Sequence, residues 1–482
     1  MRAATVGPPY QHAYGELMAE LSAEYAAWAP ASAAAQESAI QYLVDGGSHS
    51  LRLLRPFPPR IVSARGAWVT DEDGHRILDF WQGHFANILG HNPEIVTDVL
   101  AQAFGRGLGL QTGFTDRQEI GAARIICERT GSERVRFTTS GSLATMYAVM
   151  LARAFTGRES VLKVRGGWHG AQPWGLKGVS YHDPAAAASN AAAVRFDRVD
   201  SAGVPDAISQ QVVLTGFNDT ALLRETFRAH GGELACFLLE PVIGAGGMLP
   251  ATREYLREAR DLTREYGVVL ILDEVVSGFR YRAGDVGALY DVRPDLLVLG
   301  KAIGGGMPVA AVAGRAEILD LVGRGHGHAV KFSGGTYSAH PASMAAANTF
   351  MSYLVENEER VYAALRGTAT ETRRAVTEAF AEEGIAVRFA GDEDDVLPGN
   401  SLHMLRFPRG RGHRLNTPEE VYDPAICDVV LSDVVLQLAL LLEDVYTVHG
   451  LGSTTAAHTR EDIRFLAAAC RRVARRVKPH MP

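Results

Sequence analysis

Residues 268–306 read VVLILDEVVSGFRYRAGDVGALYDVRPDLLVLGKAIGGG. Two apolar runs within this stretch, 268–272 and 296–299, have the length and composition of buried strands. The first run ends in Asp273 and Glu274, and the second leads through one glycine to Lys301. In an open parallel sheet, side chains at the carboxyl ends of neighbouring strands meet at one edge, where ligands bind. We therefore expect the Lys301 amine and the Asp273 carboxylate to lie in one site.

An amine beside a buried carboxylate suits pyridoxal 5'-phosphate (PLP). A lysine forms a Schiff base with the aldehyde of PLP, and a carboxylate keeps the pyridine nitrogen protonated so that the ring can accept electrons. The sequence therefore predicts PLP as the cofactor, with Lys301 and Asp273 as the catalytic residues.

The rest of the chain predicts an α/β fold. Strand-like and helical segments alternate from about residue 95 to residue 345, which indicates a largely parallel sheet with helices on both faces. Before this region, helical periodicity up to residue 45 precedes two strand-like runs around an Asp73-Gly74 turn, a hairpin signal. After it come a long helical stretch and a polar segment, 407–424, expected to be an exposed loop. We thus expect an N-terminal segment (1–94), a large cofactor-binding domain (95–345) and a small C-terminal domain (346–482).

Composition excludes several classes of protein. The 482 residues are 47% apolar and 21% charged, enough for a large core and more than one packed unit. The formal net charge of -7 shows no basic excess, so no nucleic-acid partner is expected. Four widely separated cysteines lack metal-ligand spacing and suit reduced thiols, so no metal is expected. No apolar stretch approaches the ~20 residues of a membrane span, and we expect a cytoplasmic protein without a membrane partner.

A candidate phosphate cradle lies at Ser140-Gly141-Ser142, between a strand-like run and a helical run. Backbone N–H groups at a helix start, together with the Ser142 hydroxyl, suit a phosphate dianion. Taken alone, this turn indicates no more than a simple helix cap. A second polar turn, 333–336, offers further donors. Trp168 could stack on a pyridine ring, although an aromatic side chain there is also ordinary core.

Five motifs follow one another along the chain: LEPV at 239–242, LDEVVSGFR at 272–280, PDL at 294–296, LGKAIGGGMP at 299–308 and GTYSAHP at 335–341. Together they resemble the class III PLP-dependent aminotransferases, and most of all the glutamate-1-semialdehyde aminomutase subgroup, over residues 45–465. The resemblance implies a fold-type I transferase. Such enzymes have a mostly parallel, seven-stranded type of sheet in a large domain and a smaller α+β domain built from the two chain ends. They are usually homodimers with active sites at the subunit interface.

The resemblance also implies roles for individual residues. Lys301 would be the Schiff-base lysine and proton shuttle, and Asp273 the partner of the pyridine nitrogen. Thr336 would reach the phosphate bound in the neighbouring subunit, and Trp168 takes the place of the family's stacking tyrosine. The full set of predicted cofactor-binding residues is Ser140, Gly141, Ser142, Trp168, His169, Glu240, Asp273, Val275, Lys301 and Thr336.

Residues 46–52, GGSHSLR, resemble the substrate segment of the subgroup. There Arg52 would pair bidentately with a substrate carboxylate, a geometry that lysine cannot reproduce, and Ser50 would also contact the substrate. Arg55 is close enough in sequence to take that role instead, and Arg52 could also be an ordinary surface residue.

Three departures from the subgroup pattern bear on the reaction. Ala245 stands where the aminomutases carry an asparagine, and Leu143 stands where a Ser-Gly-Thr-Glu-Ala motif has its glutamate. Residues 448–459 also lack the acidic residue that precedes the subgroup's Ser-Ala-Ala-His-Thr-like motif. These losses favour transamination between a small-molecule amino donor and a keto acceptor, through a Lys301 Schiff base and pyridoxamine phosphate. Two alternatives stay open: an aminomutase or other amino shift or racemisation, and a PLP-binding protein without turnover.

Overall fold

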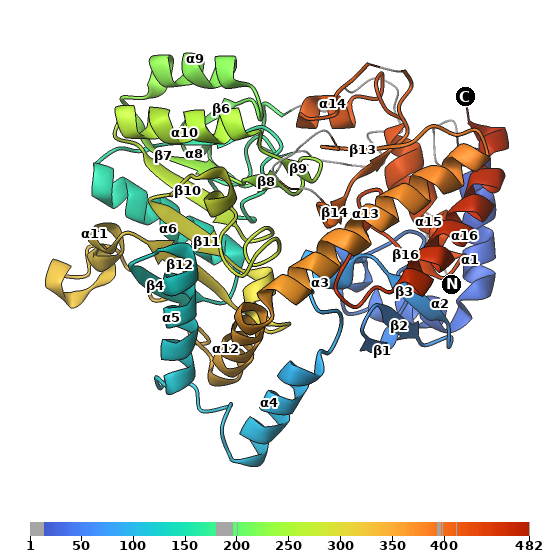
Figure 1. Cartoon of the computed structure of the whole chain (residues 1–482), viewed down its shortest axis with the longest axis horizontal. Helices are drawn as coiled ribbons and strands as arrows, with labels where there is room; N and C mark the ends of the chain where they lie inside the picture. Colours follow the sequence, from blue (N-terminus) through green and yellow to red (C-terminus); the bar gives the residue numbers. More distant parts are fainter. Residues whose placement is uncertain are drawn as a thin grey trace.

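The computed structural model describes residues 14–179, 196–199, 201–392, 397, 399–410 and 412–481. Figure 1 shows two lobes: one holds the central part of the chain around a large sheet, and the other holds both chain ends. The long helix α13 (Glu358–Glu382) runs from the first lobe into the second. Among the described residues, no helix combines the length and the hydropathy that a membrane span needs.

The large sheet has seven strands in the order β4-β12-β11-β10-β7-β5-β6. Only β12 runs against its neighbours, so the prediction of a largely parallel sheet is confirmed. The strands are β4 (Arg134–Thr138), β5 (Ser160–Val164), β6 (Val212–Thr215), β7 (Leu234–Leu239), β10 (Val269–Glu274), β11 (Leu296–Leu299) and β12 (Ala310–Gly314).

Both faces of this sheet are covered, because alternate residues of the strands belong to different cores. Val269 and Ile271 of β10 pack in the core beneath α6 (Gly141–Thr156). Leu270 and Leu272 face the opposite core, which is covered by α9 (Thr220–His230), α10 (Arg253–Glu265) and α12 (Pro341–Glu356). Burial on two faces explains why these strands read as continuous apolar runs. The helices α4 (Glu94–Gly105) and α5 (Arg117–Thr130) pack against α12, which runs across the predicted boundary at residue 345.

The second lobe joins the two chain ends. A four-stranded sheet contains β1 (Ile61–Arg65), β2 (Trp68–Asp71) and β3 (Arg76–Asp79) as an antiparallel series, with β16 (Val445–Tyr446) parallel to β3. The predicted hairpin around Asp73-Gly74 is therefore present. The N-terminal helices α1 (Gly15–Trp28) and α2 (Pro30–Ala39) and the C-terminal helix α16 (Arg460–Val477) complete the lobe. The remaining elements are α3 (Gln82–Phe85), α8 (Asp206–Gln210), α11 (Ala316–Leu319), α14 (Pro418–Tyr422), α15 (Leu436–Leu441), β8 (Val242–Ile243), β9 (Leu249–Pro250), β13 (Arg388–Phe389), β14 (Leu402–His403), β15 (Leu405–Arg406) and β17 (Gly452–Ser453).

The prediction of an exposed loop at 407–424 is confirmed only for part of that segment, because Arg409, Gly410 and residues 412–414 are exposed whereas its two ends pack inward. Phe407, Leu415, Val421 and Tyr422 are buried, and the last two belong to α14. The Tyr422 hydroxyl donates to the carbonyl of Ala245 at 2.7 Å. This segment therefore packs against the loop that follows β7, at the edge of the large sheet where the candidate site lies.

Candidate active site

The structure brings Lys301 and Asp273 to the same edge of the large sheet. β10 and β11 are parallel neighbours, with Asp273 paired in register with Val298, three residues before Lys301. Lys301 opens the short 3-10 helix η4 (Lys301–Gly304). Burial lowers the pKa of the Lys301 amine to about 8, although the nearby Glu240 and Asp273 carboxylates partly oppose that shift. An amine with this pKa is neutral in a useful fraction of molecules near pH 7 to 8, as a nucleophile or proton acceptor must be.

The Asp273 carboxylate is held from two directions. It accepts a hydrogen bond from the backbone N–H of Val275 at 3.1 Å and one from Nδ1 of His169 at 2.8 Å. His169 is buried, and burial lowers its pKa, so the neutral imidazole carries its proton on Nδ1. This hydrogen bond from His169 fixes the orientation of the Asp273 carboxylate. Such a fixed orientation is needed when a carboxylate has to face one particular atom of a ligand.

Glu240 follows β7 and has both oxygens engaged by backbone groups. One accepts from the N–H of Trp168 at 2.8 Å and the other from the N–H of Gly244 at 2.9 Å. Burial and the neighbouring Asp273 raise the pKa of Glu240, whereas these two donors and Lys301 lower it. In this chain Glu240 thus fixes the loop that carries Trp168, a side chain that remains 43% exposed at the open side of the site.

Sequence reasoning missed Lys163, a fully buried lysine in β5. Its ammonium donates to the carbonyls of Gly167 at 2.9 Å and Gly175 at 2.7 Å. Burial lowers its pKa to about 7, and the charges of Glu240 and Asp273 oppose that shift. Lys301 is therefore not the only lysine near Asp273, although the amine of Lys163 is committed to the loop that carries Trp168 and His169. The sequence did offer a signal for a functional Lys163, because this lysine interrupts the otherwise apolar strand 161–164.

The predicted phosphate turn begins α6 and lies against the other site residues. Ser140 caps the helix by accepting from the N–H of Leu143 at 3.4 Å. A Cβ on Gly141 would lie 2.9 Å from the Val275 side chain, and one on Gly170 would lie 2.2 Å from the Ser142 hydroxyl. Only glycine permits this approach, so the helix start, Val275 and the loop after Trp168 form one close-packed cradle.

Thr336 follows Gly334, whose carbonyl accepts from the Thr138 hydroxyl at 3.4 Å, just before the phosphate turn. It lies on an exposed segment, and the neighbouring Tyr337 is 61% exposed.

The predicted substrate segment lies near Lys301. Ser50 and Arg52 belong to a short 3-10 helix, η2 (Ser50–Arg52), and both are exposed. The positive charges of Arg52 and Lys301 both lower the pKa of His49, after the larger effect of burial. Arg52 therefore lies close enough to act on His49 and His84, and Arg55 is not among the charges that lower the pKa of either histidine.

Three histidines gather beside Lys301 that sequence reasoning did not select: His49, His84 and His449. The rings of His49 and His84 are 5.2 Å apart between centroids, nearly edge to face. Burial and the Lys301 charge lower the pKa of His84 to about 2. Burial also lowers the pKa of His449, and Lys301 adds to that effect. All three imidazoles are therefore neutral near pH 7 and offer polar, uncharged contacts.

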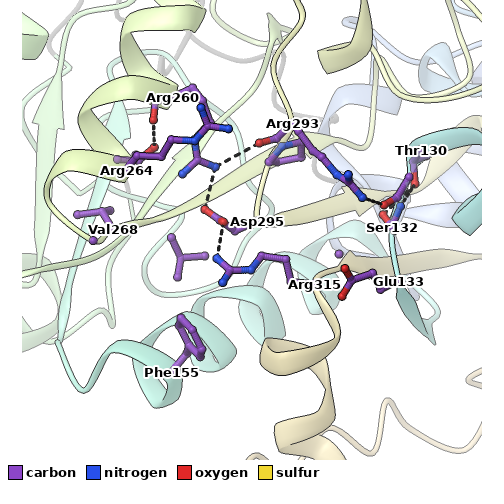
Figure 2. A pocket seen from close by; sticks show the side chains of 16 residues that line it. Thr130, Ser132, Glu133, Phe155, Arg260, Arg264, Val268, Arg293, Asp295 and Arg315 are labelled. Atoms are coloured by element: carbon purple, nitrogen blue, oxygen red, sulfur yellow. Dashed lines mark hydrogen bonds and ion pairs between the residues drawn. The ribbon is translucent and has the colours of Figure 1, made fainter.

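A separate pocket of about 480 Å³ lies at the opposite edge of the large sheet, lined by residues that precede β4, β10 and β11 and that end β12. Nη1 of Arg260 and Nη1 of Arg315 donate to the Asp295 carboxylate at 2.9 and 2.8 Å. Figure 2 shows both side chains directed at Asp295. Parallel sheets bind their substrates at the carboxyl ends of the strands, where Lys301 and Asp273 lie. This arginine-lined pocket is therefore not the candidate active site.

Comparisons with known proteins agree with the motifs. The family described as Aminotransferase class-III matches residues 54–372. A glutamate-1-semialdehyde 2,1-aminomutase of Akkermansia muciniphila is 33% identical over 438 residues, which cover 88% of this chain and 95% of that protein.

Solved structures extend the likeness to the fold. An omega-transaminase from Sphaerobacter thermophilus superposes with a TM-score of 0.82 at 27% identity, covering 93% of this chain and 98% of that one. A β-phenylalanine aminotransferase from Variovorax paradoxus superposes with a TM-score of 0.79 at 29% identity, covering 96% and 97% of the two chains. The predicted resemblance and fold class are confirmed.

Proposed function

The chain belongs to the class III aminotransferase family, and we propose that it transfers an amino group from an amino acid or related amine to a separate keto acceptor. Its cofactor is PLP. The observation that carries the proposal is the site itself: a buried amine of lowered pKa on η4 and a carboxylate oriented by a buried histidine, on neighbouring strand ends.

The donor set of the site fits PLP. Lys301 offers an amine for the aldehyde carbon, and the His169-oriented Asp273 offers a carboxylate for the pyridine nitrogen. The start of α6 offers backbone N–H groups for the phosphate, in a cradle that a Cβ on Gly141 would fill. Trp168 would cover one face of the ring. When bound, PLP supplies an electron sink that weakens the C–H bond next to the substrate nitrogen.

The residues of this chain supply proton transfer and orientation. Nζ of Lys301 accepts a proton from the substrate carbon and returns it at the next step, which a pKa near 8 allows in both directions near neutral pH. The Asp273 carboxylate would hold a proton on the pyridine nitrogen of bound PLP, and Nδ1 of His169 keeps that carboxylate in place. Arg52 would bind a substrate carboxylate and so fix which bond faces Lys301.

Transfer between two molecules is favoured over an internal amino shift by residues 245 and 143. Ala245 cannot supply the side-chain amide that the aminomutases place there. Its backbone carbonyl accepts a hydrogen bond from the Tyr422 hydroxyl. Leu143 likewise replaces a carboxylate at the start of α6. The aminomutase alternative rests on the 33% identity to the A. muciniphila enzyme over most of both chains. Racemisation and PLP binding without turnover remain further alternatives.

A panel of amino donors, with and without a keto acid, tests this proposal. Donor alone should discharge the visible absorbance of the bound cofactor once per site and release one equivalent of keto product. Added keto acid should restore the absorbance and sustain turnover. Catalytic conversion of glutamate-1-semialdehyde to its isomer with no acceptor present would instead establish the aminomutase reaction. Lys301→Ala serves as the inactive control.

We also propose that the protein is a homodimer in which Thr336 serves the neighbouring site. Exposed apolar side chains occur from the end of α4 to the start of α5. The N–H of Ala342 donates to the Gly109 carbonyl at 3.2 Å, so the segment between these helices lies beside the one that carries Thr336. The exposed set is Phe104, Leu108, Leu110, Phe114, Ile120 and Tyr337. Exposed apolar groups of this extent suit a subunit interface.

Mixing two inactive variants tests the shared site. A hybrid of Lys301→Ala and Thr336→Ala subunits contains one site with both native residues if Thr336 crosses the interface. We expect the mixture to regain activity that neither variant has alone. Absence of any regain, with hybrids shown to form by mass spectrometry, would mean that Thr336 acts in its own chain.

A further inference from the structure

The segment that follows β3 contains a left-handed turn. Four consecutive residues, Gln82 to Phe85, have φ values of 48°, 63°, 62° and 65°. Only the second is glycine, and left-handed backbone is unfavourable for the others because Cβ crowds the following carbonyl oxygen. A run of this kind persists only where surrounding contacts enforce it.

One end of the turn is held by Asp79. Its carboxylate accepts from the N–H groups of Trp81 at 2.7 Å and Gln82 at 2.9 Å, and His91 binds the same carboxylate at 2.7 Å. The Gln82 amide also donates to the Asp79 carbonyl at 2.9 Å.

The other end of the turn is held by Arg280, whose Nη2 donates to the carbonyl of Phe85. Its Nη1 donates to the Ser401 hydroxyl at 3.3 Å, and its Nε to the Val276 carbonyl at 3.4 Å. One guanidinium therefore joins three regions: the loop after β10, the left-handed turn and the part of the second lobe that carries Ser401.

Arg280 differs from the other buried arginines in its partners. It is 1% exposed, yet no carboxylate of the described residues lies within ion-pair distance of it. Arg260 pairs with Asp295 and Arg406 with Asp433, at 2.9 and 2.6 Å. Burying a cation without a counterion is costly. Packing alone does not require this cost, because an apolar side chain of similar size would fill the same space.

The loop that carries Arg280 packs against the end of β11 just before Lys301, because a Cβ on Gly278 would lie 2.5 Å from the Leu299 side chain. The charge of Arg280 therefore lies close enough to act on Lys301. It lowers the pKa of the Lys301 amine, in addition to the larger effect of burial. The left-handed turn also lies near Lys301, because it carries His84. Burial is the largest cause of the lowered pKa of His84, and the charges of Lys301 and Arg52 add to it. The neutral His84 imidazole therefore lies beside the reacting amine on the side of the predicted substrate segment.

We propose that Arg280 is a positioning residue with two separable tasks. Its guanidinium donors hold the left-handed turn so that His84 stays beside Lys301, and its charge, which no described carboxylate pairs with, is placed beside the Lys301 amine and repels a proton there. The second task deepens the proposed function and rests on it, since it matters only if Lys301 shuttles protons.

Two substitutions separate the tasks. Arg280→Met removes both the charge and the donors, whereas Arg280→Lys keeps the charge but cannot span the Phe85 carbonyl and the Ser401 hydroxyl together. Arg406→Met is the matched control, because Arg406 is equally buried but does not act on Lys301.

The first measurement is the pH dependence of Lys301 labelling by an amine reagent in the cofactor-free full-length protein, read by mass spectrometry. Arg280→Met should raise the midpoint above about 8, by only part of the difference from the 10.5 of an ordinary lysine, because burial is the larger cause of the lowered pKa. Arg280→Lys and Arg406→Met should leave the midpoint in place. An unchanged midpoint in Arg280→Met overturns the electrostatic task.

The second measurement is amide hydrogen exchange of residues 82–87 relative to the β10 core. Both Arg280 variants should speed exchange there, and Arg406→Met should not. Unaltered exchange in both variants overturns the anchoring task. If Arg280→Met fails to fold, Arg280→Lys and Ser401→Ala carry the exchange test, and Arg280→Gln carries the labelling test. Neither measurement needs a substrate, so a missing amino acceptor would refute the proposed function while leaving this inference standing.

Discussion

The buried Lys301 amine should destabilise the cofactor-free protein, and Lys301→Met should remove that cost. Unfolding returns the amine to water, where its pKa is 10.5, whereas in the folded chain the pKa is about 8. At about 1.36 kcal/mol per pH unit, this difference corresponds to about 3.4 kcal/mol. Solvent reaches part of the side chain, so we expect an effect of about 2–3 kcal/mol at pH 7.

The sign of the pH dependence follows from the lowered pKa. The unfolded chain binds the extra proton between pH 8 and pH 10.5, so the stability of the native protein rises with pH in that window. Below pH 8 the full cost of burying the charged amine is present. Lys301→Met should therefore be more stable than the native chain at pH 7, and the difference should shrink toward pH 10.5.

Urea unfolding of the two cofactor-free proteins at several pH values measures this difference. Lys331→Met is the control, because Lys331 is exposed and should show no such gain. Equal stability of Lys301→Met and the native chain at pH 7, or a difference that does not change with pH, would refute the electrostatic reasoning. The same variant should lose turnover and the visible absorbance of bound PLP. A borohydride-reducible adduct on Lys163 would show that the reactive lysine has been misassigned.

Three further outcomes are expected. Asp273→Asn should retain PLP, because the phosphate anchors most of the binding, but should lower kcat by several orders of magnitude; near-native turnover would show that another group protonates the ring. Arg52→Ala should raise KM for carboxylate substrates ~10- to 200-fold and hardly affect amines without a carboxylate. A larger effect of Arg55→Ala on KM would show that Arg55, and not Arg52, binds the substrate carboxylate. Gly141→Ala should weaken PLP binding, because the new Cβ would lie 2.9 Å from Val275. A second substitution, Val275→Ala, should recover part of that affinity, and a lack of recovery in equilibrium dialysis would contradict the steric explanation.

The sequence alone determined the central strands and what stands at their ends. The runs 268–272 and 296–299 are continuous and apolar because both faces of β10 and β11 are buried. Two parallel neighbours end at the same edge, so Asp273 and Lys301 had to meet there. The helix start at Ser140 could also be predicted, because capping is a local interaction between a side chain and the next turn.

The tertiary structure decided the groups that surround these residues. His169 reaches Asp273 across 104 residues, and Arg280 reaches the Phe85 carbonyl across 195. Polar composition hid the buried Leu415 and Val421, whose packing partners come from elsewhere in the chain. Periodicity and capping report only the near neighbours of a residue. The lowered pKa of Lys301 and the left-handed turn beside it depend on which distant charges and donors the completed fold brings within reach.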